Sequence, residues 1–338
     1  MFSLKDHIAK KGVFIIAEAG SNHDGDLDTA KKLVREAAAS GTDAVKFQAF
    51  TRDTLFAEAE YERALKLKKG ALLGVDAIAF KDEWYDVLSR EAKRAGIHFM
   101  VTPFSPEAAL RMAKYVPCYK IASCDIQYLP LLRAAAGTKK PVILSTGLAS
   151  DTDIRRAKGI LKKNEMALLH CVVEYPAPAE RAALSYIGTL AERYGVIAGY
   201  SDHTTDTFTP ALAVAHGARI IEKHFTVTPE KKGGDHAMSL SPEKFAAMVS
   251  LVRSASAAAG DGEKHLTLQE KKELVFARRG IFAAHDLRKG DSITEKDIVA
   301  LRPCTGIPAG EWDNVVGKRI KRDMASRSPI MERDIDRG

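Results

Sequence analysis

Short apolar runs, rich in β-branched and aromatic residues, alternate with amphipathic helical patterns between residue 13 and about residue 259. The helical patterns include residues 27–41, where apolar side chains recur at helical spacing, and residues 82–96. Eight β/α units in roughly 250 residues are what a closed (β/α)8 TIM barrel requires, and we predict this α/β fold. The eight runs are VFIIAEA, AVKFQAF, HFMVTPF, YKIASCD, PVILSTG, MALLHCV, VIAGYSD and RIIEKHF.

The pattern changes after the last helix of the predicted barrel. Gly260, Asp261 and Gly262 break that helix, and QEKKELVFA is typical of a linker or a short helix. From about Phe276 onward, short strands and many turns indicate a compact, irregular β-rich module of about 60 residues. Such a small module has a thin core and is expected to pack on its own barrel or on a neighbour's. The predicted domains are 1–262 (barrel), 263–276 (linker) and 277–338 (β-rich module).

Polar residues cluster where the predicted strands end. A (β/α)8 barrel carries its chemistry at the carboxyl ends of its strands, so these residues are candidates for a functional site. An open doubly wound sheet would also place a site there, but no GxGxxG or GxxxxGK[ST] follows any strand. The clustered residues are Glu18, Lys46, Gln48, Thr102, Ser123, Asp125, Ser145, Tyr175, Ser201, His203 and His224.

Composition narrows the class of protein. The chain has 338 residues, 46% of them hydrophobic, and apolar runs far shorter than the ~18 residues that span a bilayer. The N-terminus has no apolar signal core, and the four cysteines form no CxxC pair, so we expect a reduced, cytoplasmic protein without membrane contact. The net charge of +7 is spread along the chain without interleaved aromatics, which favours a small anionic substrate or a solvated surface over nucleic acid.

Histidines close two neighbouring strands. His203 follows the seventh strand and His224 ends the eighth, so the two side chains are expected about 5 Å apart. Two neutral imidazoles at that distance can share a divalent cation, although hydrogen-bonded wall residues are the alternative. His236 lies in a GGDH loop, which suits a flexible loop residue better than a rigid metal ligand.

Lysines and hydroxyls at the strand ends suit an anion. Lys46 and Gln48 share one face of the second strand, and a lysine in a barrel mouth needs a phosphate, a carboxylate or an ion pair with Glu18 or Glu222. With Lys120, the strand-end hydroxyls suggest a phosphate site, although serine in a βα turn is more often a helix cap. The hydroxyl residues are Thr102, Ser123, Ser145 and Ser201.

Carboxylates at the mouth could carry acid–base chemistry. Glu18 and Asp125 are candidates for a general acid or base or for holding polyol hydroxyls, and pairing with Lys46 is the alternative for Glu18. In the segment GSNHDGDLD we expect Asp26 or Asp28 to cap the first helix. Asn22 and His23 in the same segment stay open.

Motifs along the chain resemble the sialic acid synthase family, whose members condense phosphoenolpyruvate with an N-acetylated amino-hexose. These motifs run in order through the barrel, and the tail resembles the family's C-terminal antifreeze-like (SAF, β-clip) domain. The resemblance rests on IIAEAGSNHDGD, DAVKFQAF, VTPFS, YKIASCDI, ILSTG, HCVVEYPAP, GYSDHT, IIEKHF, GGDHAMSL and RRGIFAAHDLRKGDSITEKDI with VALRPCTGIP.

The resemblance implies roles for matching residues. His203 and His224 would bind Mn2+, with Mg2+ or Co2+ as alternatives. Phosphoenolpyruvate contacts would fall on Lys46, Thr102, Lys120, Ser123, Ser145 and Ser201. Catalytic roles would fall on Glu18 and Asp125, and sugar contacts on Gln48, Tyr175, Asp235, Phe276 and Arg302. In the family the antifreeze-like domain covers the partner subunit's barrel, so a domain-swapped homodimer with Arg302 acting in trans is implied.

Two residues depart from the family pattern and leave the identity of the sugar open. Asp125 stands where the family usually has glutamate, and Val173 where it often has a polar residue. The resemblance implies a metal-dependent synthase that cleaves the C–O bond of phosphoenolpyruvate and acts on N-acetylmannosamine or a related sugar. Alternatives are a pseudaminate or legionaminate synthase, a spore-coat-polysaccharide homologue and a 3-deoxy sugar acid synthase that uses a sugar phosphate. Residues 276–338 carry 13 basic and 10 acidic residues, which argues against a non-catalytic ice-binding module.

Overall fold

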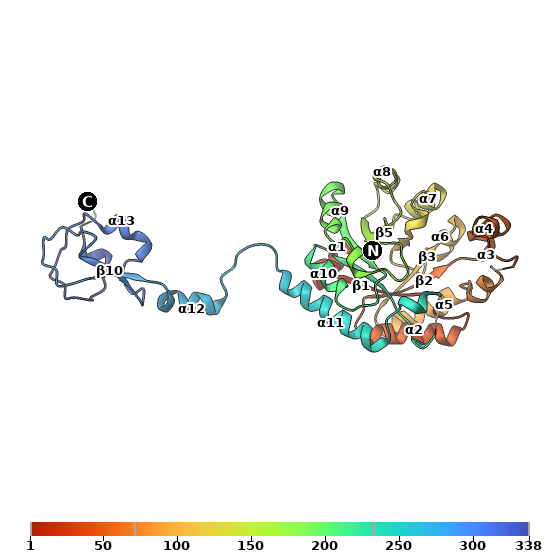
Figure 1. Cartoon of the computed structure of the whole chain (residues 1–338), viewed down its shortest axis with the longest axis horizontal. Helices are drawn as coiled ribbons and strands as arrows, with labels where there is room; N and C mark the ends of the chain where they lie inside the picture. Colours follow the sequence, from red (N-terminus) through yellow and green to blue (C-terminus); the bar gives the residue numbers. More distant parts are fainter. Residues whose placement is uncertain (1, 71, 232–233, 337–338) are drawn as a thin grey trace. The chain divides into compact units, whose positions relative to one another are not determined.

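The computed structural model describes residues 2–70, 72–231 and 234–336. It divides into two compact units, Met1–Asp261 and Gly262–Gly338, and each is described by itself (Figure 1). The boundary between them lies one residue before the end of the predicted barrel domain.

The first unit is built around eight parallel strands. Their hydrogen-bonded order is β3-β2-β1-β8-β7-β6-β5-β4, and β4 lies beside β3, which closes the ring. The predicted barrel is therefore confirmed, and every predicted run overlaps one strand. The strands are β1 (Phe14–Gly20), β2 (Ala44–Ala49), β3 (His98–Pro103), β4 (Tyr119–Ile121), β5 (Val142–Ser145), β6 (Met166–Cys171), β7 (Ile197–Asp202) and β8 (Ile220–His224).

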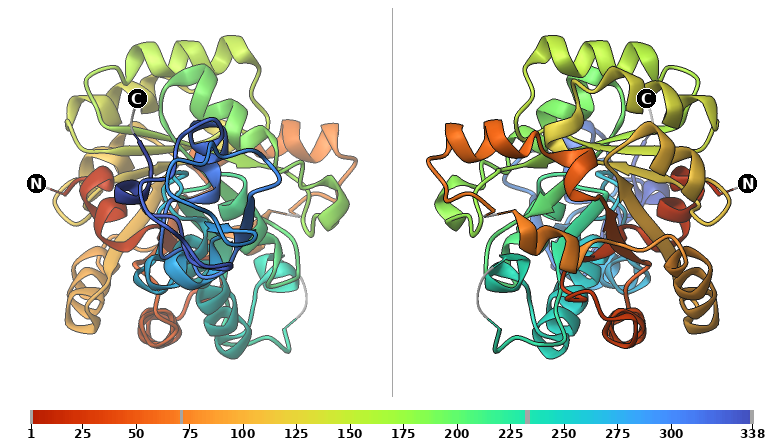
Figure 2. Two further views of the ribbon diagram at one scale, coloured as in Figure 1. Left: turned by 90° about the vertical axis from the view of Figure 1, so that its left-hand side faces the viewer. Right: turned by 90° about the vertical axis from the view of Figure 1, so that its right-hand side faces the viewer.

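Helices form an outer layer around these strands, which Figure 2 shows from two sides. The apolar stripe of α2 faces the strands with Leu33 and Val34 buried, and Asp26 caps this helix by accepting a hydrogen bond from Thr29 N, as predicted. The helices are α1 (Leu4–Lys11), α2 (Leu27–Ala39), α3 (Arg52–Leu55), α4 (Glu58–Ala64), η1 (Leu73–Ile78), α5 (Trp84–Ala95), α6 (Pro106–Met112), η2 (Ser123–Asp125), α7 (Leu129–Gly137), α8 (Asp151–Ile160), η3 (Ala179–Arg181), α9 (Tyr186–Tyr194), α10 (Thr209–Ala215), η4 (Gly234–Met238) and α11 (Pro242–Ala259).

The alternation of side chains along each strand places the polar carboxyl end of the barrel next to an apolar interior. On β1, Phe14 and Ile16 point into the barrel and belong to an interior cluster, while Ile15 and Ala17 pack against the outer helices. Glu18, two residues beyond Ile16, occupies the same inner face at the carboxyl end. Along β2 and β8, the side chains that face inward also change from apolar to charged toward the carboxyl end. The alternation of side chains along the strands therefore accounts for the position of the functional site.

The second unit is small and irregular, as predicted. It begins with α12 (Leu268–Ala277), so QEKKELVFA forms a short helix. Its strands β9 (Gly280–Ala283) and β10 (Ile298–Leu301) pair antiparallel around a separate apolar core that includes Ile281, Ile298 and Ile330. The remaining elements are η5 (Ala309–Glu311), α13 (Trp312–Val315) and η6 (Glu332–Asp334).

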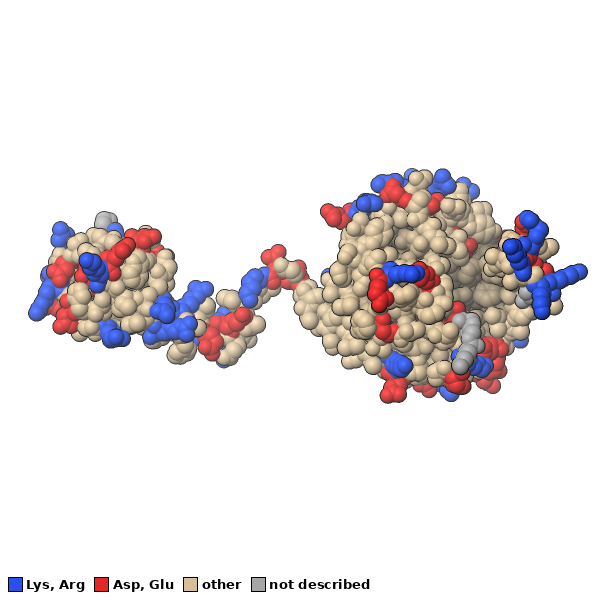
Figure 3. Space-filling model, viewed as in Figure 1, with Lys and Arg blue, Asp and Glu red and all other residues tan. Residues whose placement is uncertain are grey.

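Two surface properties bear on possible partners. On the face shown in Figure 3, positive and negative side chains are interspersed over both units. Among the described residues, no helix combines the length and apolar character needed to cross a bilayer.

Candidate active site

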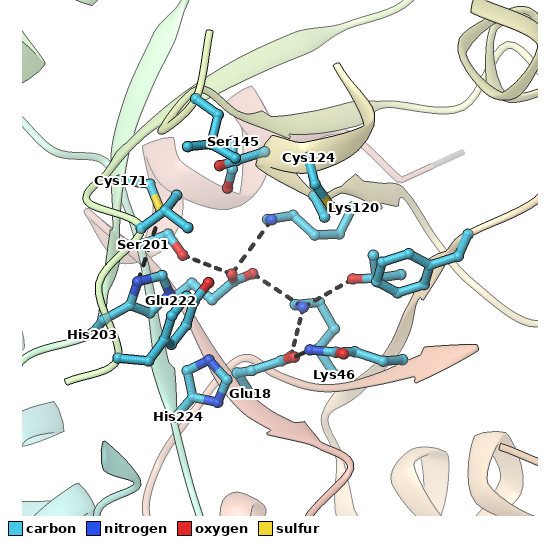
Figure 4. A pocket seen from close by; sticks show the side chains of 18 residues that line it. Glu18, Lys46, Lys120, Cys124, Ser145, Cys171, Ser201, His203, Glu222 and His224 are labelled. Carbon is cyan, nitrogen blue, oxygen red and sulfur yellow. Dashed lines mark hydrogen bonds and ion pairs between the residues drawn. The ribbon is translucent and has the colours of Figure 1, made fainter. Parts of the chain in front are cut away.

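A cavity of about 130 Å³ lies at the carboxyl ends of the barrel strands. It collects side chains from all eight strands or the turns that follow them (Figure 4). Strand alternation and the parallel arrangement together bring these distant segments to one place. The predicted site residues on its wall are Glu18, Lys46, Gln48, Thr102, Lys120, Ser123, Ser145, Tyr175, Ser201, His203 and His224.

Four buried charges form the floor of the cavity. Lys46 Nζ lies 2.6 Å from Glu18 Oε2 and 3.6 Å from Glu222 Oε2, and Lys120 Nζ lies 3.4 Å from Glu222 Oε1. These side chains point toward one another in Figure 4. The geometry of Lys46 is therefore consistent with both predictions, an ion pair and an anion contact, because the amine is paired with carboxylates and also faces the cavity.

Burial affects the two lysines differently. Burial works against the charge of Lys46, but Glu18 and Glu222 outweigh it and raise the pKa of this lysine. For Lys120, burial outweighs the attraction of Glu222 and lowers its pKa. Burial also opposes ionisation of Glu222, yet Lys120 and Lys46 hold the pKa of this carboxyl well below its usual range. The cluster thus keeps Glu222 ionised and leaves Lys120 as the less firmly charged lysine.

Hydroxyl groups surround this charged floor. Thr102 Oγ1 accepts a 2.9 Å hydrogen bond from Lys46 Nζ, and Ser201 Oγ donates one of 2.9 Å to Glu222 Oε1. Ser145 Oγ is buried and has no hydrogen-bond partner among the described residues. A buried hydroxyl without a partner is costly, so this arrangement suits a ligand with acceptor oxygens.

A glycine lets the chain approach the hydroxyl arc closely. Gly147 N donates a 3.0 Å hydrogen bond to Ser123 Oγ. A Cβ at position 147 would meet Val173 Cγ2 at 2.6 Å and the Cys171 carbonyl oxygen at 2.8 Å. Val173 therefore lies against this turn and presents an apolar surface to the cavity.

The two strand-end histidines lie together, with ring centroids 5.5 Å apart. His203 Nδ1 is 2.7 Å from the Val172 carbonyl oxygen, which can only accept, so Nδ1 carries the proton and Nε2 keeps its lone pair. Burial and the nearby His224 lower the pKa of His203 to about 4, so its ring is neutral near pH 7.

This donor set fits a divalent cation. His224 Nδ1 is buried without a hydrogen-bond partner among the described residues and lies 3.9 Å from Asp235 Oδ2. Groups of three or more His, Cys, Asp or Glu side chains arranged for a metal are absent from the described ranges. A cation at the histidine pair would therefore complete its coordination with water or substrate oxygens.

Four predicted residues lie outside the cavity wall. Asp125 is half-buried in η2, and Asp235 lies in η4. Phe276 and Arg302 belong to the second unit, where both are exposed, and their predicted contacts with the sugar stay predictions. Lys232 and Gly233, in the loop expected to be flexible, lie outside the described residues.

Sequence reasoning omitted several residues of the wall. The most consequential is Glu222, which was considered merely as a partner of Lys46 although it shares one strand face with His224 two residues later. That i, i+2 spacing at a strand end was the available signal. The other omitted wall residues are Phe104, Ala122, Cys124, Leu148 and Cys171, with Val173 noted as a departure alone.

The two residues left open have structural contacts. Asn22 Nδ2 donates to the Phe225 carbonyl oxygen and to Ser239 Oγ, both at 2.8 Å. His23 is fully buried against Phe47 and Trp84, and burial lowers its pKa to about 4. Both residues therefore hold the β1–α2 turn in place.

Burial raises the pKa of Asp125 to about 6, and stability should report this. An unfolded aspartate ionises near 3.9, so between these two pH values the folded state binds more protons and stability falls as pH rises. Because the side chain is partly exposed, we expect Asp125→Asn to raise the free energy of unfolding by about 1 kcal/mol at pH 8 and by nothing below pH 4. Urea denaturation across this pH range measures the difference, and a pH-independent difference would contradict the assignment.

The fold and the cavity define a (β/α)8-barrel enzyme whose strand ends carry two buried lysines and a histidine pair, followed by a small β-rich domain. The chain belongs to the NeuB family, whose sequence model matches residues 33–264, and a SAF domain matches residues 278–336. The resemblance to the sialic acid synthase family and the predicted fold class are thereby confirmed.

Similar proteins extend over nearly the whole chain. An N,N'-diacetyllegionaminic acid synthase of Legionella pneumophila is 37% identical, covering 96% of this chain and 94% of its own. A pseudaminic acid synthase of Campylobacter jejuni is 33% identical, covering 96% and 97%. The crystal structure of an N-acetylneuraminic acid synthetase from Leptospira borgpetersenii matches with a TM-score of 0.71 and 38% identity, covering 78% of this chain and 90% of that one.

Proposed function

We propose that the protein is a nonulosonic acid synthase that condenses phosphoenolpyruvate with an N-acetylated amino sugar and releases phosphate. The observation that carries this proposal is the single cavity in which two buried lysines, a hydroxyl arc and a histidine pair converge. An anion with a phosphate and a carboxylate matches the lysines and hydroxyls, and an aldehyde-bearing sugar matches the histidine side. The names of the similar proteins support this combination.

The sugar is N-acetylmannosamine or a related 6-deoxy derivative. Identity does not choose between these sugars, because the legionaminic acid synthase is 37% identical and the N-acetylneuraminic acid synthetase 38% identical. Asp125 and the apolar Val173 surface are the departures that bear on this choice, because both lie beside the Ser123 turn of the cavity wall.

Three of the four buried charged groups have a role in the proposed condensation. Lys46 and Lys120 neutralise the phosphate and carboxylate of phosphoenolpyruvate, and a buried site strengthens these interactions. The C3 methylene attacks the aldehyde carbon of the sugar, and water then adds at C2. Glu18, which accepts a 2.7 Å hydrogen bond from Gln48 Nε2, would orient or deprotonate that water, and phosphate would leave with C–O cleavage.

The histidine pair would hold a divalent cation, with Mn2+ as the expected ion. When bound, it would polarise the carbonyl oxygen of the open-chain sugar as a Lewis acid. Tyr175, whose ring centroid is 4.1 Å from that of His203, covers the same end of the cavity and is assigned to the sugar.

The second unit is assigned to the partner subunit's barrel in a domain-swapped homodimer. Phe276 is 68% exposed, which a contact in an assembly would relieve. In this arrangement Phe276 and Arg302 contact the sugar in trans.

Phosphate release tests the proposed function. We expect purified protein with Mn2+ to release phosphate from phosphoenolpyruvate when N-acetylmannosamine or its 6-deoxy diacetamido relatives are added, and to release none without sugar. With 18O at the bridging position of phosphoenolpyruvate, the label should appear in phosphate, because the C–O bond breaks. Release with none of these sugars would contradict the proposal.

The alternative acceptor is a sugar phosphate, as in a 3-deoxy sugar acid synthase. A second phosphate needs further basic residues at the mouth, whereas the lysines on the described cavity wall are Lys46 and Lys120, both already assigned to phosphoenolpyruvate. Turnover with arabinose 5-phosphate or N-acetylmannosamine 6-phosphate, and none with the neutral sugars, would favour this alternative.

A further inference from the structure

The loop that carries Asp235 is fastened to a loop at the opposite end of the barrel sequence. Residues 225–241 follow β8, and residues 21–26 follow β1. Asn22 bonds Ser239 Oγ, which in turn donates a 2.5 Å hydrogen bond to the Asp235 carbonyl oxygen. These contacts fix the backbone of Asp235 but not yet the direction of its side chain.

His236, the next residue, supplies a second attachment. Its ring is buried, and both nitrogens have partners: Nε2 lies 3.2 Å from Asp24 Oδ1, and Nδ1 lies 2.9 Å from Thr226 Oγ1. Ionised Asp24 can only accept, so Nε2 donates to it, while the Thr226 hydroxyl is the partner of Nδ1. The ring thus bridges the two loops.

Asp24 is itself held in position. Lys231 Nζ lies 2.6 Å from Asp24 Oδ2, so the carboxylate binds two residues of the other loop, one with each oxygen. Burial alone would raise the pKa of Asp24, but hydrogen bonds from Lys231 and His236 outweigh it and lower the pKa. The carboxylate is therefore ionised near pH 7 and can act as a fixed acceptor.

This attachment determines where the neighbouring carboxylate points. Asp235 Oδ2 lies 3.9 Å from His224 Nδ1 and packs against Gly20, where an added Cβ would stand 2.3 Å from that oxygen. Gly20 has φ +51°, a conformation that favours glycine. The Asp235 carbonyl oxygen is held by Ser239, and the next residue is held by the bonds of the His236 ring. The Asp235 side chain is therefore directed toward the histidine end of the cavity.

We propose that His236 is a positioning residue that, through Asp24, holds the Asp235 carboxylate at the sugar end of the active site. This inference rests on the proposed function, in which Asp235 contacts the sugar. His236 itself touches neither substrate in this arrangement.

Two amide substitutions of His236 separate the bond to Asp24 from the bond to Thr226. His236→Gln extends an N–H donor to about the position of Nε2, whereas His236→Asn reaches no farther than Nδ1. We expect His236→Asn to raise the KM for the sugar about tenfold or more while the KM for phosphoenolpyruvate stays within about twofold. His236→Gln should retain a sugar KM near the wild-type value, and the exposed His216→Asn serves as the control.

Asp24→Ala approaches the same bond from the other loop. It should raise the sugar KM at least as much as His236→Asn does, and the double variant should be no worse than Asp24→Ala alone, because Asp24→Ala already removes the bond to His236. A normal sugar KM in Asp24→Ala, additive effects, or equal losses for both substrates would overturn the proposal.

Hydrogen exchange provides a readout that does not need turnover. In His236→Asn, backbone amides of Thr226 and Leu240 should exchange faster than in the wild type, with no change in His216→Asn. If the wild-type protein condenses none of the sugars, the proposed function fails while this measurement still tests the attachment. Unchanged exchange in His236→Asn would overturn the attachment even in an active enzyme.

Discussion

Replacing His203 by alanine is expected to reduce turnover by about 10³-fold or more and to weaken Mn2+ binding. The hydrogen bond from Nδ1 to the Val172 carbonyl oxygen orients the ring and leaves the lone pair of Nε2 available to a metal ion. Since His224 is the other histidine of the pair, one substitution removes half of the protein's imidazole donors. Turnover against Mn2+ concentration, and calorimetric titration of metal-stripped protein with Mn2+, measure the two effects.

A buried histidine elsewhere in the barrel provides the matched control. His170 lies on β6, with Nε2 2.7 Å from the Ala182 carbonyl oxygen, and does not line the cavity. His170→Ala is expected to lower stability without changing the affinity for Mn2+. If His203→Ala kept its Mn2+ affinity and turnover, the histidines would be wall residues, which is the alternative that the sequence left open.

The predictable part of the site is the part that strand geometry controls. In a parallel barrel, polar residues two apart at a strand end must face the same mouth, so Lys46 and Gln48, or Ser201 and His203, could be brought together from spacing alone. Glu222 obeys the same rule, but it was not predicted as a site residue because an ion pair with Lys46 was enough to explain it.

Asp125 shows where this rule ends. Strand β4 stops at Ile121, and Ser123–Asp125 then form a 3-10 turn, in which alternate residues no longer share a face. Ser123 still lines the cavity, but Asp125 does not. The alternation rule holds only within a strand, and the sequence pattern did not reveal that β4 ends at Ile121.

Loop contacts were equally out of reach. The GGDH segment predicts a loop around His236, but its partner Asp24 lies 212 positions away and comes beside it because β1 and β8 are neighbours in the closed barrel. Spacing within a loop carries no such information, so the bridge between the two loops could be found in the structure alone.

The two cavity lysines should respond very differently to the same substitution. Lys46→Met is expected to lower the free energy of unfolding by about 3–5 kcal/mol, because it leaves the buried carboxylate of Glu18 without its cation and takes one of two from Glu222. Lys120→Met should cost no more than about 1–2 kcal/mol, since burial already disfavours the charge of Lys120 and Glu222 keeps Lys46 and Ser201. Urea denaturation at pH 7 compares the two variants.

Both lysine variants should nevertheless show a similar loss of affinity for phosphoenolpyruvate. Each removes one buried cation that faces the anion, and about 10²-fold weaker binding is expected for either, measured by calorimetry at a temperature where both variants are folded. Gln48→Met is the matched control, because it removes a cavity side chain that carries no charge and should leave this affinity within about threefold. Equal destabilisation by the two lysine substitutions would mean that Glu18 finds another partner. A loss of phosphoenolpyruvate in Lys46→Met alone would restrict the anion site to the Glu18 side of the cavity.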